Sequence, residues 1–466
     1  MLWREMFEPA RMQRVAVVAP RDRLRPVLLT LASLGCVEPE LLAVSGTEAE
    51  AVLQRVQALG PREPTTPMLS PGVPDLAALE RAGDAAALAG EVELQRVEAS
   101  MIREGSTAAL AGWAPSAQLD RLAQVLAPEG AAVVRLKPPR GVQPPTVLHG
   151  SSSSVAFQPL VNTYGTVPYA DLNPSILAGV AYVLMFGMMF GDAGHGFLLL
   201  VLGCIAAWAP QGRSASLRRF RWAAPFLIGA GLVSMGFGFA FGEAFGPTGL
   251  VPTLWMRPLD HATTLLAVSV AIGAVILAVS YTLGAVNRFR EGGIARSLVA
   301  LSGIAGAALY LGLAVVGSGW YWHRTSMVLS GTALAILALA LGFAGLFAEA
   351  GGRASGALEA GVELFDGLLR LGTNTVSFAR LAAFGLTHAA LSSLVWTGTA
   401  DLWNRGGVLD VVVAIIVFAL GNALTFALEA LVAGVQALRL EYYEIFSRVF
   451  TTEGREFHPW QVQVRQ

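Results

Sequence analysis

The chain has 466 residues, of which 54% are hydrophobic and 14% charged, with a formal net charge of −1. Soluble domains carry about a quarter charged residues, so lipid is the expected main solvent, and no basic stripe suggests nucleic acid. Cys36 and Cys204 lie far apart in the sequence and predict free thiols. The segment Met1–Pro20 lacks the apolar core and cleavage site of a secretory signal, so we expect the N-terminal region in the cytoplasm.

Residues 1–155 contain frequent charges and short apolar runs, which predict a small α/β and helical domain. The expected strands are Arg14–Ala19, Leu41–Val44 and Ala131–Leu136. The expected helices are Arg21–Leu34, Thr47–Leu59 and one or two within Leu76–Arg103. Two segments rich in proline predict linkers, namely Pro61–Pro74 and Pro138–Ser154, and the second leads into the rest of the chain.

Residues 156–466 carry long uncharged stretches that predict a membrane domain. A bilayer core of about 30 Å needs about 20 helical residues, and about 17 are tolerated. The stretches do not alternate polar and apolar residues as barrel strands do, so we expect helices. The fold class is therefore mainly α, with an eight-helix polytopic membrane domain after the small α/β domain. The eight stretches are Pro174–Phe190, Ala193–Gly212, Trp222–Gly242, Ala262–Asn287, Ser297–Trp322, Thr325–Ala348, Leu381–Ala400 and Val411–Leu428.

The connecting loops predict the orientation of these helices. In an eight-span topology, the arginine-rich loops Gly212–Arg221 and Asn287–Arg296 fall on the same side as the C-terminal tail. The opposite loops each carry about one arginine. Because basic loops stay inside, we expect both termini in the cytoplasm.

Four ionisable residues lie in or beside the last apolar stretches, where such groups are costly and usually functional. Arg380 is either an interfacial anchor or part of one long tilted helix that begins in Gly356–Ser377. His388 is either a helix-packing hydrogen bonder or a group lining a hydrated path. Glu429 either ends a helix or lies at membrane depth. Arg439 follows Glu429 by about 15 Å of helical rise, a spacing that suits a polar path better than one ion pair.

Other polar positions are weaker signals by themselves. Asp192 and His195 occupy the tight turn between the first two stretches, and Glu243 closes the third, so a hairpin tip and a helix end are the simplest interpretations. The sequence contains no Walker-type glycine-rich loop followed by lysine, and histidine and cysteine do not cluster at ligand spacing. We therefore expect no cofactor, no bound metal and no catalysis by this chain alone.

Four segments together resemble the a/I subunit of V-type and archaeal-type rotary ATPases. They are Tyr169–Gly196 with MFGMMFGDAGHG, Gly236–Gly246 with GFGFAFGEAFG, Asn374–Leu394 with NTVSFARLAAFGLTHAALSSL, and the tail Leu428–Trp460. The resemblance covers the membrane region in order and spacing. In the N-terminal region the resemblance is weaker and is limited to Met12–Pro39, Gly112–Pro115 and Lys137–Pro139. This region has only a short helical arm at the place where the family inserts a long coiled coil.

The resemblance implies a non-catalytic stator subunit of a proton-translocating rotary ATPase, with ion half-channels facing a rotating proteolipid ring. Arg380 matches the essential arginine that faces the ring carboxylate. His388, Glu429 and Arg439 match supporting residues in the half-channel walls, and Glu429 is the best candidate for a proton-accepting group. We further expect Asn374, Ser377, Glu441 and Glu444 as possible channel lining. Asp192, His195 and Glu243 match motif positions whose roles stay open.

The implied partners are the proteolipid ring, peripheral stalk subunits at residues 1–155, and the central-stalk and nucleotide-binding subunits through the complex. The expected location is a prokaryotic plasma membrane. One alternative is an ion-coupled secondary transporter or ion-conducting module that reuses the fold, for which internal repeats are expected but none is clear in the sequence. A non-conducting scaffold is another alternative, but it would not need Arg380, Glu429 and Arg439 in apolar helices.

Overall fold

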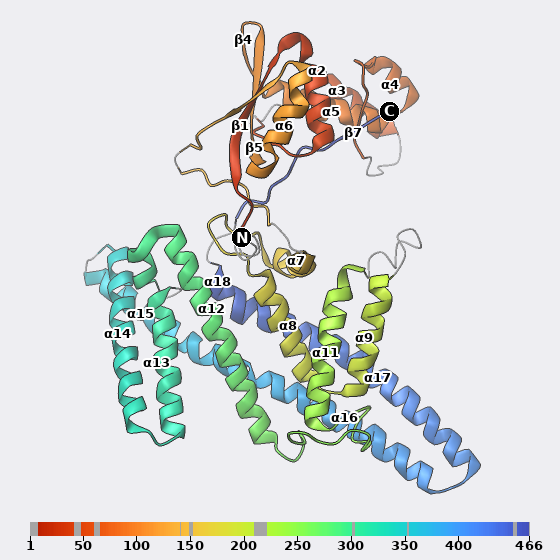
Figure 1. Ribbon diagram of the computed structural model, residues 1–466, viewed down its shortest axis with the longest axis vertical. Coiled ribbons are helices and arrows are strands. Elements are labelled where there is room, and N and C mark those ends of the chain that lie inside the picture. Colours follow the sequence, from red (N-terminus) through yellow and green to blue (C-terminus); the bar gives the residue numbers. More distant parts are fainter. Residues whose placement is uncertain are drawn as a thin grey trace. The chain divides into compact units, whose positions relative to one another are not determined.

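A computed structural model describes residues 8–41, 48–59, 66–139, 141–148, 152–208, 221–300, 303–351, 354–450 and 454–465. The chain forms two compact units (Figure 1). The sheet unit comprises Glu8–His149 together with Gly454–Gln466, and the membrane unit comprises Gly150–Glu453 with Met1–Phe7.

The sheet unit is built around an antiparallel sheet in the order β2-β5-β1-β6, with β4 paired to β5. The strands are β1 (Met12–Pro20), β2 (Glu38–Pro39), β4 (Ile102–Glu104), β5 (Thr107–Pro115) and β6 (Ala132–Arg135). Val15, Val17 and Ala19 of β1 are buried in alternation, as expected for a strand with one covered face. The strands expected at 14–19 and 131–136 are confirmed. The one expected at 41–44 lies outside the described residues apart from Leu41.

Helices supply the remainder of the sheet unit and confirm the three helical predictions made for residues 21–103. They are α2 (Leu24–Leu34), α3 (Glu48–Leu59), α4 (Leu76–Ala82), α5 (Ala85–Ala99) and α6 (Leu119–Leu126), with short 3₁₀ turns η1 (Arg21–Arg23), η2 (Ser116–Gln118) and η3 (Ala127–Glu129). Leu28, Leu31, Leu122 and Leu126 are buried in the core formed with the sheet. Asp75 and Asp84 cap the starts of α4 and α5, which makes the stretch two helices.

The C-terminal tail belongs to the sheet unit, although we assigned it to the membrane domain from the sequence. Trp460 donates its backbone N–H to Val37 O, at 2.9 Å. Farther on, β7 (Gln463–Val464) pairs in parallel with β3 (Met68–Leu69), inside the segment predicted as a linker. Trp460 and Val462 are buried in the sheet-unit core. The apolar side chains of the tail therefore find their cover here.

The membrane unit is entirely helical among its described elements. It contains α7 (Ser152–Tyr164), α8 (Ser175–Met189), α9 (Ala193–Trp208), η4 (Arg221–Ala223), α11 (Ala224–Phe241), α12 (Ala262–Val299), α13 (Ile304–Tyr321), α14 (Thr325–Glu349), α15 (Ala354–Ser377), α16 (Ala379–Asn404), α17 (Val408–Leu440), the π-helix η5 (Glu441–Phe446) and α18 (Ser447–Val449). Six helical stretches in the described part are long and apolar enough to cross a membrane. The first two expected spans correspond to α8 and α9, which are apolar but have 15 and 16 residues. The protein is thus a mainly helical integral membrane protein with a small sheet region.

Small residues bring α8, α9 and α11 together. In Figure 1, α11 lies between α8 and α9, and it packs against both. A Cβ atom added at Gly231 of α11 would lie 2.6 Å from the backbone N of Leu200 in α9. One added at Gly238 would lie 2.1 Å from the backbone N of Ala193. Glycine therefore lets α11 press against the α8–α9 turn, which carries Asp192.

Arg380 lies inside a long helical stretch, which agrees with the second of its two interpretations, a position within one long helix. The stretch Ser355–Asn404 is continuous except for a break at Phe378, between α15 and α16. Phe378 is fully buried against α12, where a Cβ atom added at Gly273 would lie 2.1 Å from its Cγ. Figure 1 shows α16 and α17 as a long antiparallel pair, oblique to α11 and α12.

Candidate functional site

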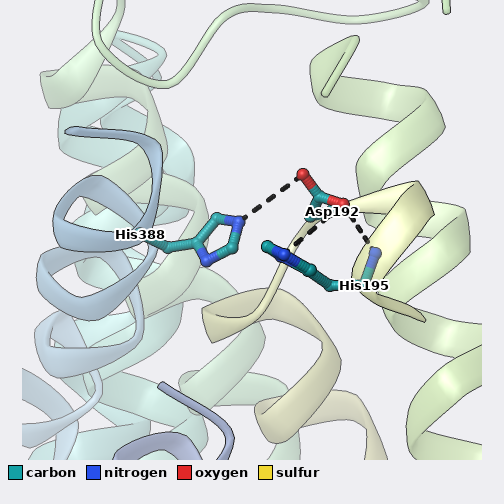
Figure 2. A group of neighbouring side chains, drawn as sticks. All are labelled: Asp192, His195 and His388. Atoms are coloured by element: carbon teal, nitrogen blue, oxygen red, sulfur yellow. Dashed lines mark hydrogen bonds and ion pairs between the residues drawn. The ribbon is translucent and has the colours of Figure 1, made fainter. Parts of the chain in front are cut away.

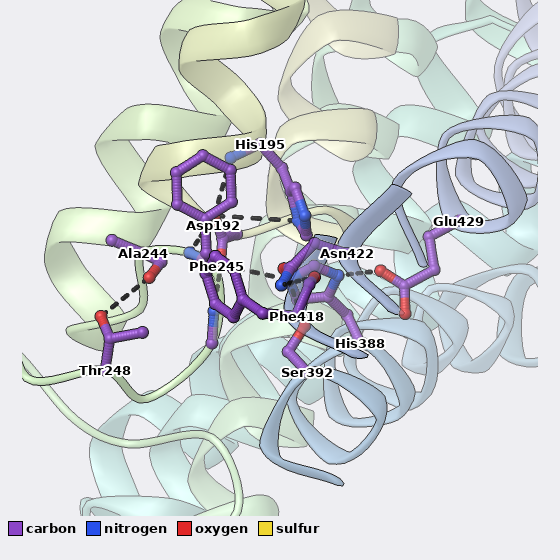
Figure 3. A network of polar contacts seen from close by, with 11 residues as sticks. Asp192, His195, Ala244, Phe245, Thr248, His388, Ser392, Phe418, Asn422 and Glu429 are labelled. Atoms are coloured by element: carbon purple, nitrogen blue, oxygen red, sulfur yellow. Dashed lines mark hydrogen bonds and ion pairs between the residues drawn. The ribbon is translucent and has the colours of Figure 1, made fainter. Parts of the chain in front are cut away.

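Asp192 is the anchor of the site, at the turn between α8 and α9. Its Oδ1 accepts backbone N–H groups from His195, at 2.8 Å, and from Phe245, at 3.0 Å. Its Oδ2 accepts the N–H of Gly246 at 2.9 Å. The side chain is fully buried and caps the start of α9. One carboxylate thus ties the α8–α9 turn to the loop after α11 (Figure 3).

His388 of α16 lies between two carboxylates. Its Nδ1 pairs with the carboxylate of Glu429, which projects from α17. Its Nε2 faces Asp192 Oδ2 at 3.8 Å and Ser392 Oγ at 3.5 Å (Figure 3). The first of these distances is within ion-pair range but too long for a direct hydrogen bond. We call Asp192, His195, His388 and Glu429 the histidine cluster.

His195 completes this cluster from the first turn of α9. Its ring centroid lies 5.7 Å from that of His388 and 5.3 Å from that of Phe245, with edge-to-face geometry in both pairs. The side chain is fully buried, and neither ring nitrogen makes a hydrogen bond of normal geometry among the described residues. Its Nδ1 lies 3.8 Å from Asp192 Oδ1, and the Asn422 side chain of α17 lies beside the ring. The cluster therefore holds an imidazole whose polar atoms are only weakly satisfied.

Glu243 lies beside the histidine cluster, just after α11. Its backbone carbonyl accepts the N–H of Ala193 at 2.9 Å, while its buried Oε2 has no partner among the described residues. Burial raises the pKa of Glu243 to about 7, against the opposing effect of His388. A partly open cavity of 270 Å³ adjoins this side chain, and its polar lining includes Arg257, Asp260 and Ser393. The cavity reaches Ala389, which follows His388 directly on α16.

A second group, which we call the arginine cluster, gathers where α15, α16 and η5 meet. It comprises Asn374, Ser377, Arg380, Arg439, Glu444 and Arg448. Glu444 lies near Ser377 and within electrostatic range of all three arginines. The Asn374 amide, oriented to satisfy both of its ends, accepts from Arg448 Nη2 at 2.7 Å. Arg380 is half-buried, and its buried Nη1 has no partner among the described residues.

The π-helix η5 separates two glutamates that the sequence places close together. Glu444 joins the arginine cluster, whereas Glu441 is fully buried, and neither of its carboxylate oxygens has a partner in the described part of the chain. Glu441 lies near Tyr182 of α8. Wide helical turns of this kind are frequent at functional sites.

The structure thus sorts most of the predicted site residues into two places. His388 and Glu429 join Asp192 and His195, with Glu243 beside them, so these motif residues form part of the site and are not a solvated hairpin tip. Arg380 and Arg439 join three of the predicted lining residues, Asn374, Ser377 and Glu444, and Arg380 lies about 12 Å of helical rise from His388 along α16. The fourth, Glu441, lies in neither cluster. Sequence reasoning missed Ser392 and Asn422. Helical spacing could have found both, since Ser392 follows His388 by one turn and Asn422 precedes Glu429 by two.

Comparisons with known proteins identify the family of the chain. A family model described as the V-type ATPase 116kDa subunit family matches residues 97–255 and 368–462. The A-type ATP synthase subunit I of Pyrococcus horikoshii is 25% identical over 388 residues, covering 77% of this chain and 54% of the relative. The A-type ATP synthase subunit I of Aeropyrum pernix is 27% identical over 358 residues, which cover 66% of this chain and 50% of the relative.

The subunit I of Methanocaldococcus jannaschii is 22% identical over 462 residues, covering 92% of this chain and 63% of the relative. The chain spans about half the length of the first of these relatives. The resemblance drawn from the four motifs is confirmed. Because the two matched segments hold more than half of the chain and every residue of both clusters, the chain belongs to the V-type ATPase 116kDa subunit family.

Proposed function

We propose that this chain is the membrane stator subunit of a V/A-type rotary ATPase, forming two proton half-channels against a rotating proteolipid ring. The family match and the relatives named A-type ATP synthase subunit I support this role. The two polar clusters, which lie at different heights along α16 and α17, suit two offset pathways. The chain itself hydrolyses no nucleotide in this proposal.

The observation that carries the proposal is the guanidinium of Arg380. A guanidinium stays charged in essentially every environment, and Arg380 Nη1 has no hydrogen-bond partner among the described residues, so the group can take a counter-ion in addition to the nearby Glu444. A carboxylate on a passing ring subunit supplies it. Facing Arg380, that carboxylate favours its ionised form and releases its proton. The fixed positive charge also repels a proton that would leak directly between the half-channels.

An exposed aliphatic stripe on α17 suits the surface that the ring covers. Its members follow one another every three or four residues along one face of the helix, which ends near the exposed Arg439. The stripe consists of Leu420, Leu424, Leu428, Leu431 and Val435. Such a smooth apolar face can slide past a ring without breaking polar contacts.

The histidine cluster is the proposed wall of the outward half-channel. The cavity beside Glu243 is its entrance, and the His388–Glu429 pair carries the proton further toward the ring. The arginine cluster, with Glu444 as its carboxylate, is the proposed wall of the cytoplasmic half-channel. Arg439 and Arg448 fit this side, because basic residues collect in the cytoplasm.

In the same proposal, α8 and α9 cross the bilayer together with the six longer stretches, which gives eight spans. Both termini and residues 1–155 lie in the cytoplasm of a prokaryotic cell. The sheet unit, with its short helical arm, attaches to peripheral stalk subunits. Central-stalk and nucleotide-binding subunits are partners through the complex.

The test replaces Arg380 in the purified, reconstituted complex. Arg380→Ala should abolish ATP-driven proton transport while the subunit still assembles with its partners. Arg405→Ala is the matched control, because Arg405 is exposed at the end of α16, and it should transport normally. Normal transport by Arg380→Ala contradicts the mechanism.

A mild-detergent pull-down of the tagged chain should recover a proteolipid and nucleotide-binding subunits. Recovery of the chain alone would favour a transporter that reuses the fold.

A further inference from the structure

We propose that Asp192, His195 and His388 form a binding site for a divalent zinc-class ion. The three side chains come from the α8–α9 turn, the start of α9 and the middle of α16, and Figure 2 shows them converging. One ligand atom from each lies within 4.8 Å of the other two, and all three side chains are buried. In the part of the chain that the structure describes, no other group of histidine, cysteine and carboxylate side chains meets this arrangement.

The distances between the ligand atoms fit a shared ion after a small adjustment. His388 Nε2 lies 3.8 Å from Asp192 Oδ2. Two atoms bound to one zinc ion at about 2.0–2.2 Å each lie roughly 3–4 Å apart. The ligand atoms of the three side chains lie within 4.8 Å of one another, so the longest distance between two of them has to shorten by about 1 Å. A rotation of an imidazole ring can supply this change.

The surroundings hold two of the ligands in place before any ion arrives. Asp192 accepts three backbone N–H groups, which fix its plane, and Oδ2 accepts only one of them. Oδ2 thus keeps a lone pair for the site. Glu429 pairs with Nδ1 of His388, so the other nitrogen, Nε2, faces Asp192 Oδ2 and Ser392 and can bind an ion between them. A carboxylate behind a histidine ligand is the usual support of a metal-binding imidazole.

The weakly satisfied ring of His195 is a second sign of a ligand. Both of its nitrogens are buried and, among the described residues, make no hydrogen bond of normal geometry, with only the Asn422 side chain and the Asp192 carboxylate near them. Burying such a group costs free energy unless a partner offsets the cost. A metal ion bound to one nitrogen supplies that partner, and water or the nearby Ser392 hydroxyl completes the coordination.

The donor set selects the class of ion. Two imidazoles and one carboxylate with an open position suit Zn²⁺ and its neighbours among the transition metals. Mg²⁺ and Ca²⁺ prefer oxygen ligands throughout. The cavity beside Glu243 provides an approach that ends one residue from His388 on α16.

The consequence for transport rests on the proposed function. An ion held by His388 and His195 fastens α9 to α16 and fills the proposed outward half-channel. Zn²⁺ added on that side should therefore inhibit proton transport, and a chelator should reverse the inhibition. The binding itself does not depend on transport, so the two ideas can fail separately.

The binding test uses the full-length protein purified in detergent, stripped with a chelator and dialysed against buffered Zn²⁺. We expect about one Zn²⁺ per chain by elemental analysis, and Co²⁺ in its place should show the visible absorption of a four-coordinate nitrogen and oxygen site. His195→Gln and His388→Gln should each lose this ion, and Glu429→Gln should weaken binding by about 10- to 100-fold, because it removes only the support of His388. His261→Gln and Cys204→Ser are controls, since both side chains are exposed and lie outside the cluster.

Retention of the ion by both His195→Gln and His388→Gln overturns the site, as does the absence of Zn²⁺ binding by a wild-type chain that is folded by circular dichroism. A preference for Mg²⁺ or Ca²⁺ overturns the assigned class of ion. Zinc binding together with normal transport by Arg380→Ala would reject the proposed function and leave the metal site standing.

Discussion

Glu429 of α17 pairs with Nδ1 of His388 on α16, and the same imidazole turns its Nε2 toward Asp192 on the α8–α9 turn. Three segments that are distant in sequence thus meet at one ring. Because both carboxylates are buried, each depends on this histidine for part of its charge compensation. The pairing has consequences for transport and for stability that can be measured separately.

Removing the charge of Glu429 should slow transport without abolishing it. Glu429→Gln keeps the shape of the side chain but cannot accept a proton, so we expect ATP-driven proton transport to fall by about 10-fold or more. Arg380→Ala should remain the more severe variant. The exposed Asp401 near the end of α16 supplies the control, since Asp401→Asn should leave the rate unchanged. Equal rates for Glu429→Gln and wild type would remove Glu429 from the pathway.

Asp192 should be a structural anchor as well as a site residue. Asp192→Asn replaces one accepting oxygen with an N–H₂ group, which cannot accept the backbone N–H groups that the carboxylate satisfies. Each hydrogen bond to a charged group contributes about 1.5–3 kcal/mol, so we expect a clear fall in the thermal unfolding temperature, measured with a chelator present. Asp401→Asn, at an exposed position near the end of α16, should unfold like wild type. An unchanged unfolding temperature for Asp192→Asn would show that these bonds contribute little.

Gly238 should tolerate no side chain, whereas Gly236 on the same helix should. A Cβ atom at Gly238 would lie 2.1 Å from the backbone N of Ala193, but one at Gly236 meets nothing within 4 Å. Gly238→Ala must push α11 away from the α8–α9 turn, at a cost of about 1–3 kcal/mol. Gly236→Ala should be neutral or slightly stabilising, because alanine favours the helix. The thermal unfolding temperatures of the two variants, measured in detergent, distinguish them. Equal unfolding temperatures would contradict the packing argument.

Asp171 should make the stability of the membrane unit depend on pH. It is fully buried before α8, beside Glu291 and 3.9 Å from Arg288. Burial, followed by the neighbouring Glu291, raises the pKa of Asp171 to about 7. The folded state therefore binds this proton more tightly than the unfolded chain does, so the contribution to stability is full in acid and is lost as the pH rises toward 7.

Unfolding temperatures measured between pH 5 and pH 8 should consequently fall with rising pH. In Asp171→Asn, which is neutral at every pH, the slope should be smaller over the same interval. Asp401→Asn, at an exposed position, is the control, and its slope should match that of wild type. A steeper slope in Asp171→Asn would contradict the assigned direction.

The sequence by itself determined the membrane character of the protein, most of its long helices and its family. Hydropathy acts along the chain, so each stretch that must avoid water is visible where it stands. Arg380, His388 and Glu429 stood out for the same reason, since an ionisable group in an apolar run is costly wherever the run folds. The strand predicted at 14–19 and the helices predicted at 21–34 and 47–59 were equally local, because their periodicity depends only on near neighbours.

Only the tertiary structure decided which of these groups meet. Asp192 and His195 lie nearly two hundred residues before His388, and no local pattern distinguishes a buried anchor from a hairpin tip. The tail likewise joined the sheet unit because β3 and the sheet-unit core cover its apolar residues, a pairing that its own sequence does not encode. Contacts of this kind arise when close packing at Gly238 and Gly273 fixes how helices approach, and helix periodicity contains no information about the partner.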